Sequence, residues 1–78
     1  MKIMIVDDST TIRHAIKAKL QGEEVEIVEC TDGREAIERY AVHRPDLVLM
    51  DLEMEHVDGF EATRQITTGF PDAHIIIL

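Results

Sequence analysis

Three aspartates in this chain of 78 residues have a spacing that indicates a binding or catalytic site. Asp7 and Asp8 directly follow a short apolar run at residues 3–6, and Asp51 closes a second apolar run at residues 47–50. Neighbouring strands of a parallel α/β sheet gather their following loops at one edge, where ligands bind. Adjacent positions for these two strands would therefore bring three carboxylates into one small volume. Taken singly, each aspartate could instead be a helix cap or a loop residue.

Converging carboxylates repel one another, so such a site either raises a pKa or binds a cation. Ligands that are all oxygen suit Mg²⁺ or Mn²⁺, and a carboxylate beside a bound metal can act as a nucleophile toward a phosphoryl donor. The four histidines are scattered and the chain has a single cysteine, so a zinc site is not expected. The sequence contains neither a P-loop nor a G-x-G-x-x-G motif, which argues against nucleotide binding.

The apolar pattern predicts four strands that alternate with three helices. The predicted strands cover residues 3–6, 25–30, 46–51 and 74–78, and the predicted helices cover residues 9–22, 32–44 and 58–69. Each crossover is long enough for a helix, which predicts a parallel sheet with helices on its faces. In residues 25–30, apolar residues alternate with glutamate, which indicates an edge strand. Residues 46–51 form a continuous apolar run between aspartates, which indicates a buried central strand. The last run, HIIIL, also predicts a strand buried on both faces.

The predicted helices have recognisable apolar faces and starts. The first places its apolar residues on one stripe, made of Ile12, Ala15, Ile16 and Leu20. The other two begin with D-G-x-E tetrapeptides at residues 32–35 and 58–61, in which the aspartate is a cap candidate. These two matches hint at an internal repeat, although capping chemistry alone would produce them.

Charge and composition restrict the function classes. The chain has 16 acidic and 8 basic residues, and its formal charge of −8 disfavours direct binding to nucleic acid or to anionic membranes. The apolar start is too short and wrongly flanked for a signal peptide or a membrane span. The lone Cys30 indicates a small core residue in a reducing compartment. Together these features predict a cytoplasmic protein.

Two segments together resemble the receiver domains of two-component response regulators. They are IMIVDDST, at residues 3–10, and PDLVLMDLEMEHVDGFEATRQI, at residues 45–66, and the resemblance runs in one register over residues 2–78. It implies a flavodoxin-like parallel sheet, (βα)3β, with strand order 2-1-3-4. It also implies that residues 1–78 are a truncated receiver domain, which lacks the last strand and the last two helices of the family's fold.

The same resemblance implies a role for each acidic residue. Asp51 is expected to accept a phosphoryl group from a histidine kinase with the help of Mg²⁺. Asp8 is expected to bind the metal directly and Asp7 mostly through water, and the backbone carbonyl of Glu53 completes the protein's ligands. The resemblance thus implies a signalling module and not an enzyme.

The sequence departs from the family pattern in the loop after Asp51. Met54 is followed by Glu55, where receivers usually have proline, so this loop is expected to be less rigid. Glu53 and Glu55 are candidates for modulating the site, and Glu53 is expected either to tune the lifetime of the phosphoaspartate or to be a solvated loop glutamate. The family's switch hydroxyl and phosphate-binding lysine have no counterpart in these residues. Switching is therefore expected to be impaired.

Two other functions remain open at this point. One is a folded fragment that associates without phosphotransfer, because an uncovered fourth-strand edge or uncovered helix and sheet faces favour self-association. The other, more distant, is a metal-dependent phosphatase of the haloacid-dehalogenase type, which also uses an aspartate nucleophile at a strand end. That family's D-x-D-x-[TV] pattern differs from the DLEME found at Asp51.

Overall fold

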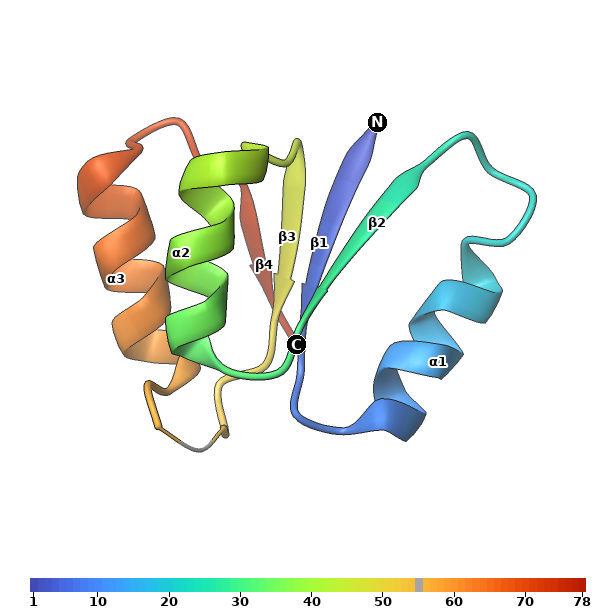
Figure 1. The fold of residues 1–78 in the computed structure, drawn as a ribbon, viewed down its shortest axis with the longest axis horizontal. Coiled ribbons are helices and arrows are strands. Elements are labelled where there is room, and N and C mark those ends of the chain that lie inside the picture. The colour runs from blue at the N-terminus through green and yellow to red at the C-terminus, as the bar shows by residue number, and fades with distance from the viewer. Residues whose placement is uncertain (55) are drawn as a thin grey trace.

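Strands and helices alternate along the whole chain in the computed structural model, which describes residues 1–54 and 56–78 (Figure 1). The elements are β1 (Lys2–Val6), α1 (Thr10–Lys19), β2 (Glu26–Cys30), α2 (Gly33–His43), β3 (Leu47–Met50), α3 (Gly59–Gly69) and β4 (Ile75–Ile77). Every element falls within or next to its predicted range, so the predicted order is confirmed. No helix in the described part of the chain is long and apolar enough to cross a membrane.

The four strands form one parallel sheet in the order β2-β1-β3-β4. This is the predicted flavodoxin-like order. The glutamate-rich β2 lies at an edge, and β1 and β3 lie inside the sheet, as predicted. Val6 pairs with Cys30 on one side and with Met50 on the other, so three strands finish at the same level. The residues that follow them must therefore meet at one edge of the sheet.

Local capping chemistry sets the start of each helix. The side chains of Ser9, Asp32 and Asp58 each accept a hydrogen bond from the backbone N–H three residues later, at 3.2, 2.8 and 2.9 Å. These bonds satisfy N–H groups that have no partner inside the helix. At the other end of α2, Arg44 adopts a left-handed conformation with φ of 45°, immediately before Pro45. Since the residue before proline disfavours the helical conformation, the helix ends there.

The glycine in each D-G pair has a packing role that the sequence reading did not find. A Cβ atom on Gly33 would lie 2.1 Å from the carbonyl oxygen of Val57, and one on Gly59 would lie 2.2 Å from the carbonyl oxygen of Asp51. Both distances are far below van der Waals contact. Each tetrapeptide thus combines a capping aspartate with a residue small enough for close backbone approach.

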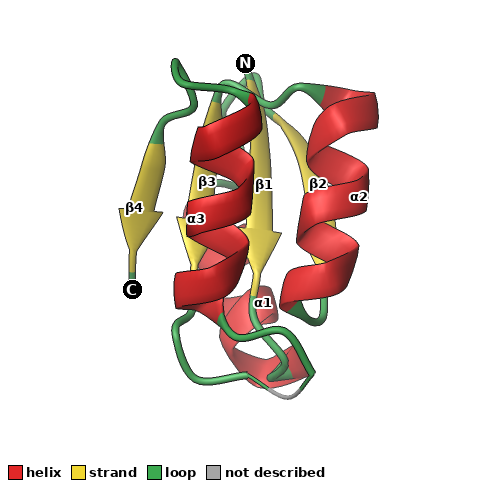
Figure 2. Cartoon of the chain, turned by 90° about the vertical axis from the view of Figure 1, so that its left-hand side faces the viewer, coloured by secondary structure: helices red, strands yellow, loops and turns green. Residues whose placement is uncertain are grey.

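The core lies between the sheet and the pair formed by α2 and α3. Figure 2 shows these two helices side by side in front of the strands, with α1 behind them. The buried core side chains come from the inner strands, from the end of β2 and from the two helices: Met4, Val6, Val28, Cys30, Ala36, Tyr40, Val48, Met50, Ala62 and Ile66. The prediction that Cys30 is a core residue is confirmed.

The opposite face of the sheet is covered less completely, and the prediction that the last strand is buried on both faces is wrong. No residue of α1 is buried, and the side chain of Ile12, on the predicted apolar stripe, is 45% exposed. In β4, Ile76 and Ile77 are 52% and 44% exposed, so this strand is not buried on both faces. For Ile12 and Ile76 the reason is that α1 is the one helix on this face within the described residues. Ile77 pairs with the core residue Met50, so it lies on the α2–α3 face and is exposed at the edge of the sheet.

Candidate metal and phosphoacceptor site

The ends of β1 and β3 bring the three predicted aspartates together. The backbone N–H of Asp51 donates to the carbonyl oxygen of Val6 at 2.9 Å, which fixes the two strand ends side by side. One carboxylate oxygen from each of Asp7, Asp8 and Asp51 lies within 4.8 Å of the others. The convergence follows from strand register, since each acid comes directly after a paired strand residue.

The two aspartates after β1 lie in different surroundings. Asp7 is buried, and its carboxylate accepts a hydrogen bond from the backbone N–H of Ser9 at 2.8 Å. The backbone N–H of Asp7 donates to the carbonyl oxygen of Cys30 at 3.1 Å. Asp8 is exposed, and no donor among the described residues bonds to its carboxylate. The carboxylate of Asp8 is thus left with its full capacity to bind a cation, whereas Asp7 is partly committed to holding the loop.

Asp51 is half-buried and is held by the loop that follows it. Its Oδ1 atom accepts a hydrogen bond from the N–H of Glu53 at 3.1 Å, so Oδ2 is the oxygen without a described partner. The side chain of Glu53 is exposed, and its carbonyl accepts no hydrogen bond from the described residues. That carbonyl therefore remains available as a ligand. Glu55, the other residue predicted to modulate the site, lies outside the described residues.

The loop after Asp51 is anchored from both ends. Gly59, the first residue of α3, donates its N–H to the carbonyl of Leu52 at 3.1 Å and lies directly against the backbone of Asp51. Met54 packs against the core cluster as a half-buried side chain. The start of α3 therefore supports Asp51 from behind, a contact that only glycine can make.

Cys30 lies behind the acidic site and takes no part in metal binding. Burial, and to a smaller extent the nearby carboxylate of Glu35, raises the pKa of its thiol to about 12. A thiol with such a pKa stays protonated at neutral pH and is a poor nucleophile and a poor metal ligand. The site is therefore made of oxygen ligands, as the sequence predicts.

Arg13 supports the acidic site, and the sequence reading did not single it out. Its Nη1 atom donates to the backbone carbonyl of Asp7 at 2.6 Å, and its Nε atom donates to Glu29 at 3.1 Å. The sequence does contain a sign of this role. Arg13 is a charged residue next to the apolar stripe of its helix, and Glu29 is a charged residue of a predicted edge strand. Their pairing depends on the placement of α1 against β2, which spacing alone does not give.

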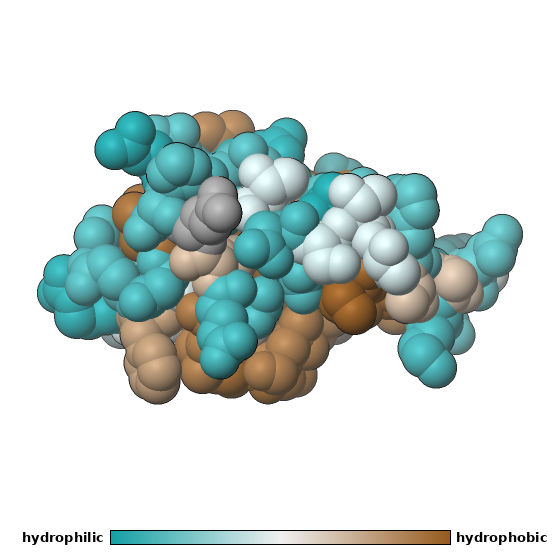
Figure 3. Space-filling model, turned by 90° about the horizontal axis from the view of Figure 1, so that it is seen from below, coloured by the Kyte–Doolittle hydropathy of each residue, from teal (hydrophilic) through white to brown (hydrophobic). Residues whose placement is uncertain are grey.

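The donor set fits a hard divalent cation. Three carboxylates with oxygens within 4.8 Å of one another, plus the carbonyl of Glu53, to which no described residue donates, are oxygen ligands of the kind that Mg²⁺ takes. Figure 3 views the molecule from the side where the strands end, and hydrophilic side chains cover much of this surface. Solvent can thus supply the water ligands that Mg²⁺ usually keeps.

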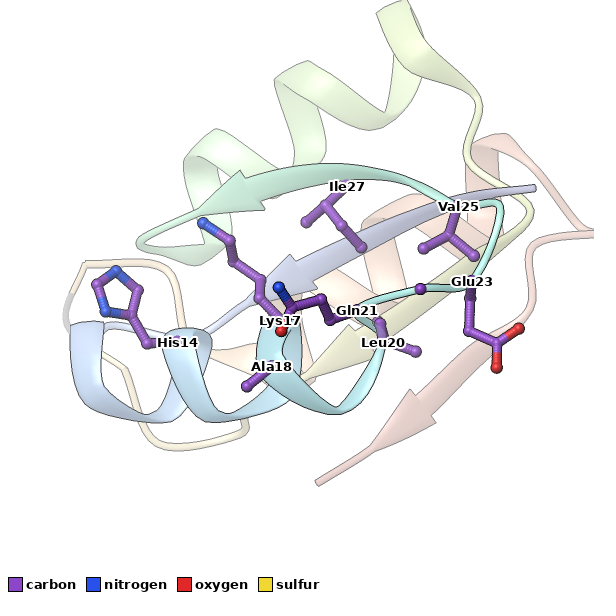
Figure 4. A pocket seen from close by; sticks show the side chains of 9 residues that line it. His14, Lys17, Ala18, Leu20, Gln21, Glu23, Val25 and Ile27 are labelled. Carbon is purple, nitrogen blue, oxygen red and sulfur yellow. The ribbon is translucent and has the colours of Figure 1, made fainter.

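The largest depression described on the molecule lies elsewhere. It has a volume of about 550 Å³, is open to solvent and lies between α1 and β2, with His14, Lys17 and Glu23 among its lining residues (Figure 4). None of the three clustered aspartates lines it. The candidate metal site is therefore identified by the convergence of carboxylates, and it does not coincide with the largest described depression.

Comparisons with curated proteins point to one family. The chain is 36% identical over 80 aligned residues to the transcriptional regulatory protein LiaR of Bacillus subtilis, and 40% identical to the response regulator protein VraR of Staphylococcus aureus. Each match covers the whole of this chain and 38% of the relative. The chain thus spans well under half the length of these relatives.

Solved structures agree with this result. The response regulator TrrA of Thermotoga maritima, in complex with Mg²⁺ and beryllium fluoride, superposes with a TM-score of 0.91 at 37% identity, over 97% of this chain and 66% of that one. The CheX–CheY complex of Borrelia burgdorferi, also with Mg²⁺ and beryllium fluoride, gives a TM-score of 0.93 at 28% identity, over 99% of this chain and 60% of the other. Residues 3–78 match the profile of the response regulator receiver domain. The chain therefore belongs to the receiver domain family of response regulators.

Proposed function

We propose that residues 1–78 form a phosphoacceptor unit of a two-component phosphorelay. In the cytoplasm, Asp51 accepts a phosphoryl group from a histidine kinase, and Mg²⁺ or Mn²⁺ is bound by Asp7, Asp8, Asp51 and the carbonyl of Glu53. The observation that carries this proposal is the convergence of three carboxylates within 4.8 Å at the ends of β1 and β3. The unit receives and holds a phosphoryl group and does not turn over a separate substrate, so it is a signalling module and not an enzyme.

The hydrogen bonds of Asp51 define its role in the transfer. The N–H of Glu53 holds Oδ1, which leaves Oδ2 to attack the phosphorus atom of a phosphohistidine in line with the leaving nitrogen. A new O–P bond forms as the N–P bond breaks, and the electron pair returns to the imidazole ring, which takes a proton from solvent. A bound Mg²⁺ would supply positive charge to the phosphoryl oxygens during this step.

Electrostatics makes a cation necessary for this reaction. Three carboxylates within 4.8 Å of one another repel an incoming phosphoryl group, and the chain as a whole carries a formal charge of −8. Asp8 is exposed and without a described partner, so it is the carboxylate best placed to recruit the cation. Neutralisation by a divalent ion would thus precede any productive approach of the phosphoryl donor.

The wider role of the protein follows from its relatives and forms part of the proposal. The transcriptional functions in the names of LiaR and DegU belong to proteins of which this chain matches 38% and 34%. Because residues 1–78 are strongly acidic, direct contact with nucleic acid is left to other regions of such proteins. The family's switch hydroxyl and lysine have no counterpart in these residues, so phosphorylation of this unit alone produces an incomplete switch.

Self-association is a second candidate function that a specific observation favours. Ile76, Ile77 and Leu78 are 52%, 44% and 53% exposed at the sheet edge formed by β4. Exposed apolar strand edges favour pairing with another chain. Light scattering at several concentrations should show a dimer or larger species, and a monomer at high concentration would contradict this candidate.

The phosphoacceptor role is tested by intact-mass measurement after incubation with Mg²⁺ and acetyl phosphate. The wild-type chain and Asp72→Asn, which changes an exposed loop carboxylate, should each gain one phosphoryl group. Asp51→Asn should gain none, and chelation of the metal should abolish the adduct in every variant. An adduct that persists in Asp51→Asn would refute the assignment of the acceptor. Steady hydrolysis of phosphate esters would instead favour a phosphatase, and metal binding without any adduct would favour an interaction fragment.

Glu53 is proposed to modulate the lifetime of the phosphoaspartate. Its side chain is exposed and follows the acceptor by two residues, so its charge can repel phosphate or hinder the attacking water. Glu53→Gln should therefore change the rate of phosphate release, measured as loss of the adduct with time. An unchanged rate would identify Glu53 as a solvated loop residue. For Glu55 the same exchange tests the modulating role predicted from the sequence.

A further inference from the structure

We propose that Arg13 is a positioning residue for the carboxylate site, holding the loop between β1 and α1 so that Asp7 and Asp8 keep their place beside Asp51. The inference rests on the proposed metal site at these three aspartates. Arg13 itself does not touch the metal or the phosphoryl group. It acts through the main chain of Asp7.

The contacts of the guanidinium group support this role. Arg13 donates from Nη1 to the backbone carbonyl of Asp7 at 2.6 Å, and its side chain is only 11% exposed. That carbonyl belongs to the peptide unit joining Asp7 to Asp8. A short charge-assisted bond to it restricts rotation of this peptide, and with it the direction in which the Asp8 side chain leaves the loop.

A second carboxylate holds the guanidinium in place. Glu29 of β2 accepts from Arg13 Nε at 3.1 Å and from Lys17 Nζ at 2.9 Å. The bond from Lys17, and then the one from Arg13, outweigh the raising effect of desolvation, so the pKa of the Glu29 carboxyl is lowered. Glu29 is therefore ionised at neutral pH. The arginine is fixed between an edge strand and the loop that it supports.

The rest of α1 offers little other support for this loop. None of its residues is fully buried, so apolar packing fixes this helix against the sheet less tightly than it fixes α2 and α3. Repulsion among the three carboxylates favours movement of the exposed Asp8 away from its neighbours when no cation is bound. The bond from Arg13 to the Asp7 carbonyl opposes that movement.

Charge and positioning predict opposite results, which makes the inference testable. A guanidinium beside a cation site repels the cation, so Coulomb interaction alone predicts tighter Mg²⁺ binding once Arg13 is neutralised. Loss of positioning predicts weaker binding, and removal of groups that orient metal ligands typically weakens affinity by about 10- to 100-fold. The sign of the change therefore separates the two effects.

The experiment is isothermal titration of Mg²⁺ into the wild-type chain, Arg13→Gln, Arg13→Lys and Lys19→Gln. Lys19→Gln removes the same charge from an exposed position of the same helix and is the matched control. Arg13→Gln should bind Mg²⁺ about tenfold more weakly than wild type. Arg13→Lys keeps the charge and one donor and should recover part of that loss, whereas Lys19→Gln should bind like wild type. The amide signal of Ser9, bonded to the Asp7 carboxylate, should shift in Arg13→Gln and not in the control.

Equal or tighter Mg²⁺ binding by Arg13→Gln would overturn the inference. A wild-type chain without measurable Mg²⁺ affinity would remove the proposed metal site, and the inference with it. If Arg13→Gln does not fold, Glu29→Gln takes its place, because it releases the guanidinium while keeping the arginine. Because this variant also removes a negative charge, its matched control is Glu26→Gln, at an exposed position of the same strand. Weaker Mg²⁺ binding by Glu29→Gln than by Glu26→Gln supports the positioning role, and equal binding refutes it.

Discussion

Helices α2 and α3 share one face of the sheet and bury Ala36, Tyr40, Ala62 and Ile66 there, whereas α1 buries no residue on the opposite face. The local sequence of all three helices has an apolar stripe and a capping residue. The difference in burial therefore comes from their surroundings. Two adjacent helices cover each other's sides, whereas both sides of a single helix stay exposed to solvent. An apolar stripe indicates which side of a helix is buried, but not how deeply.

The two faces of the sheet also support different residues of the acidic site. Asp51 is backed by the packed face, through the close approach of Gly59 to its carbonyl. Asp7 is backed by the other face, through a hydrogen bond from Arg13. One half of the site thus depends on steric fit and the other on charge and hydrogen bonding. Each half should respond to a different kind of perturbation.

The largest expected effect comes from truncating matched isoleucines on the two faces. Ile66 is 2% exposed and Ile12 is 45% exposed. Ile66→Ala should lower the free energy of unfolding by about 3 kcal/mol, because it leaves a cavity in the core. Ile12→Ala should cost less than about 1 kcal/mol, because its side chain is already half in water. Urea unfolding measures both values, and equal costs would show that α1 is packed as tightly as α3.

The next effect concerns Gly59, the glycine that brings α3 against Asp51. Gly59→Ala places a Cβ atom 2.2 Å from the carbonyl oxygen of Asp51, so the backbone must move. We expect a loss of about 1–3 kcal/mol in the free energy of unfolding, as for other overpacked sites. Gly69→Ala, at the far end of the same helix, meets nothing within 4 Å and should be neutral or stabilising by up to about 1 kcal/mol. Thermal unfolding of both variants checks the pair. A tolerated Gly59→Ala would contradict the close contact.

The smallest effect should appear on the α1 face and should depend on pH. The pKa of Glu29 is lowered from its ordinary value of 4.5, chiefly by Lys17 and then by Arg13. A lowered folded-state pKa stabilises the fold above the unfolded value and loses that contribution as the pH falls toward the folded one. Glu29→Gln should therefore cost at most about 1 kcal/mol at pH 7, and the difference from wild type should shrink below pH 4.5.

Urea unfolding of wild type and Glu29→Gln at neutral and acid pH measures that difference. The cost of Ile66→Ala should stay nearly constant over the same range, since no charge is removed from the packed face. A Glu29→Gln penalty that persists in acid would show that packing, and not charge, accounts for its effect. Taken with the first comparison, this would remove the distinction between the two faces.

The element order, the helix starts and the position of the acids were readable from the sequence because each depends on residues close together in the chain. Asp32 and Asp58 cap their helices as their local patterns predict. The convergence of the aspartates needed one further step, the parallel pairing of β1 with β3. The alternation of strands and helices restricts that pairing to few arrangements.

Other features were decided only by the tertiary structure, because they depend on which distant segments share a face. The contacts of Gly33 and Gly59 appear only once α2, α3 and the loop after β3 are brought together. The exposure of Ile12 and Ile76 reflects the sparse cover of one sheet face, which an apolar stripe does not report. Likewise, Arg13 reaches the Asp7 carbonyl because Glu29 of β2 draws the guanidinium into place. The sequence by itself determined which groups could form the site, and packing between remote segments decided which residues hold them there.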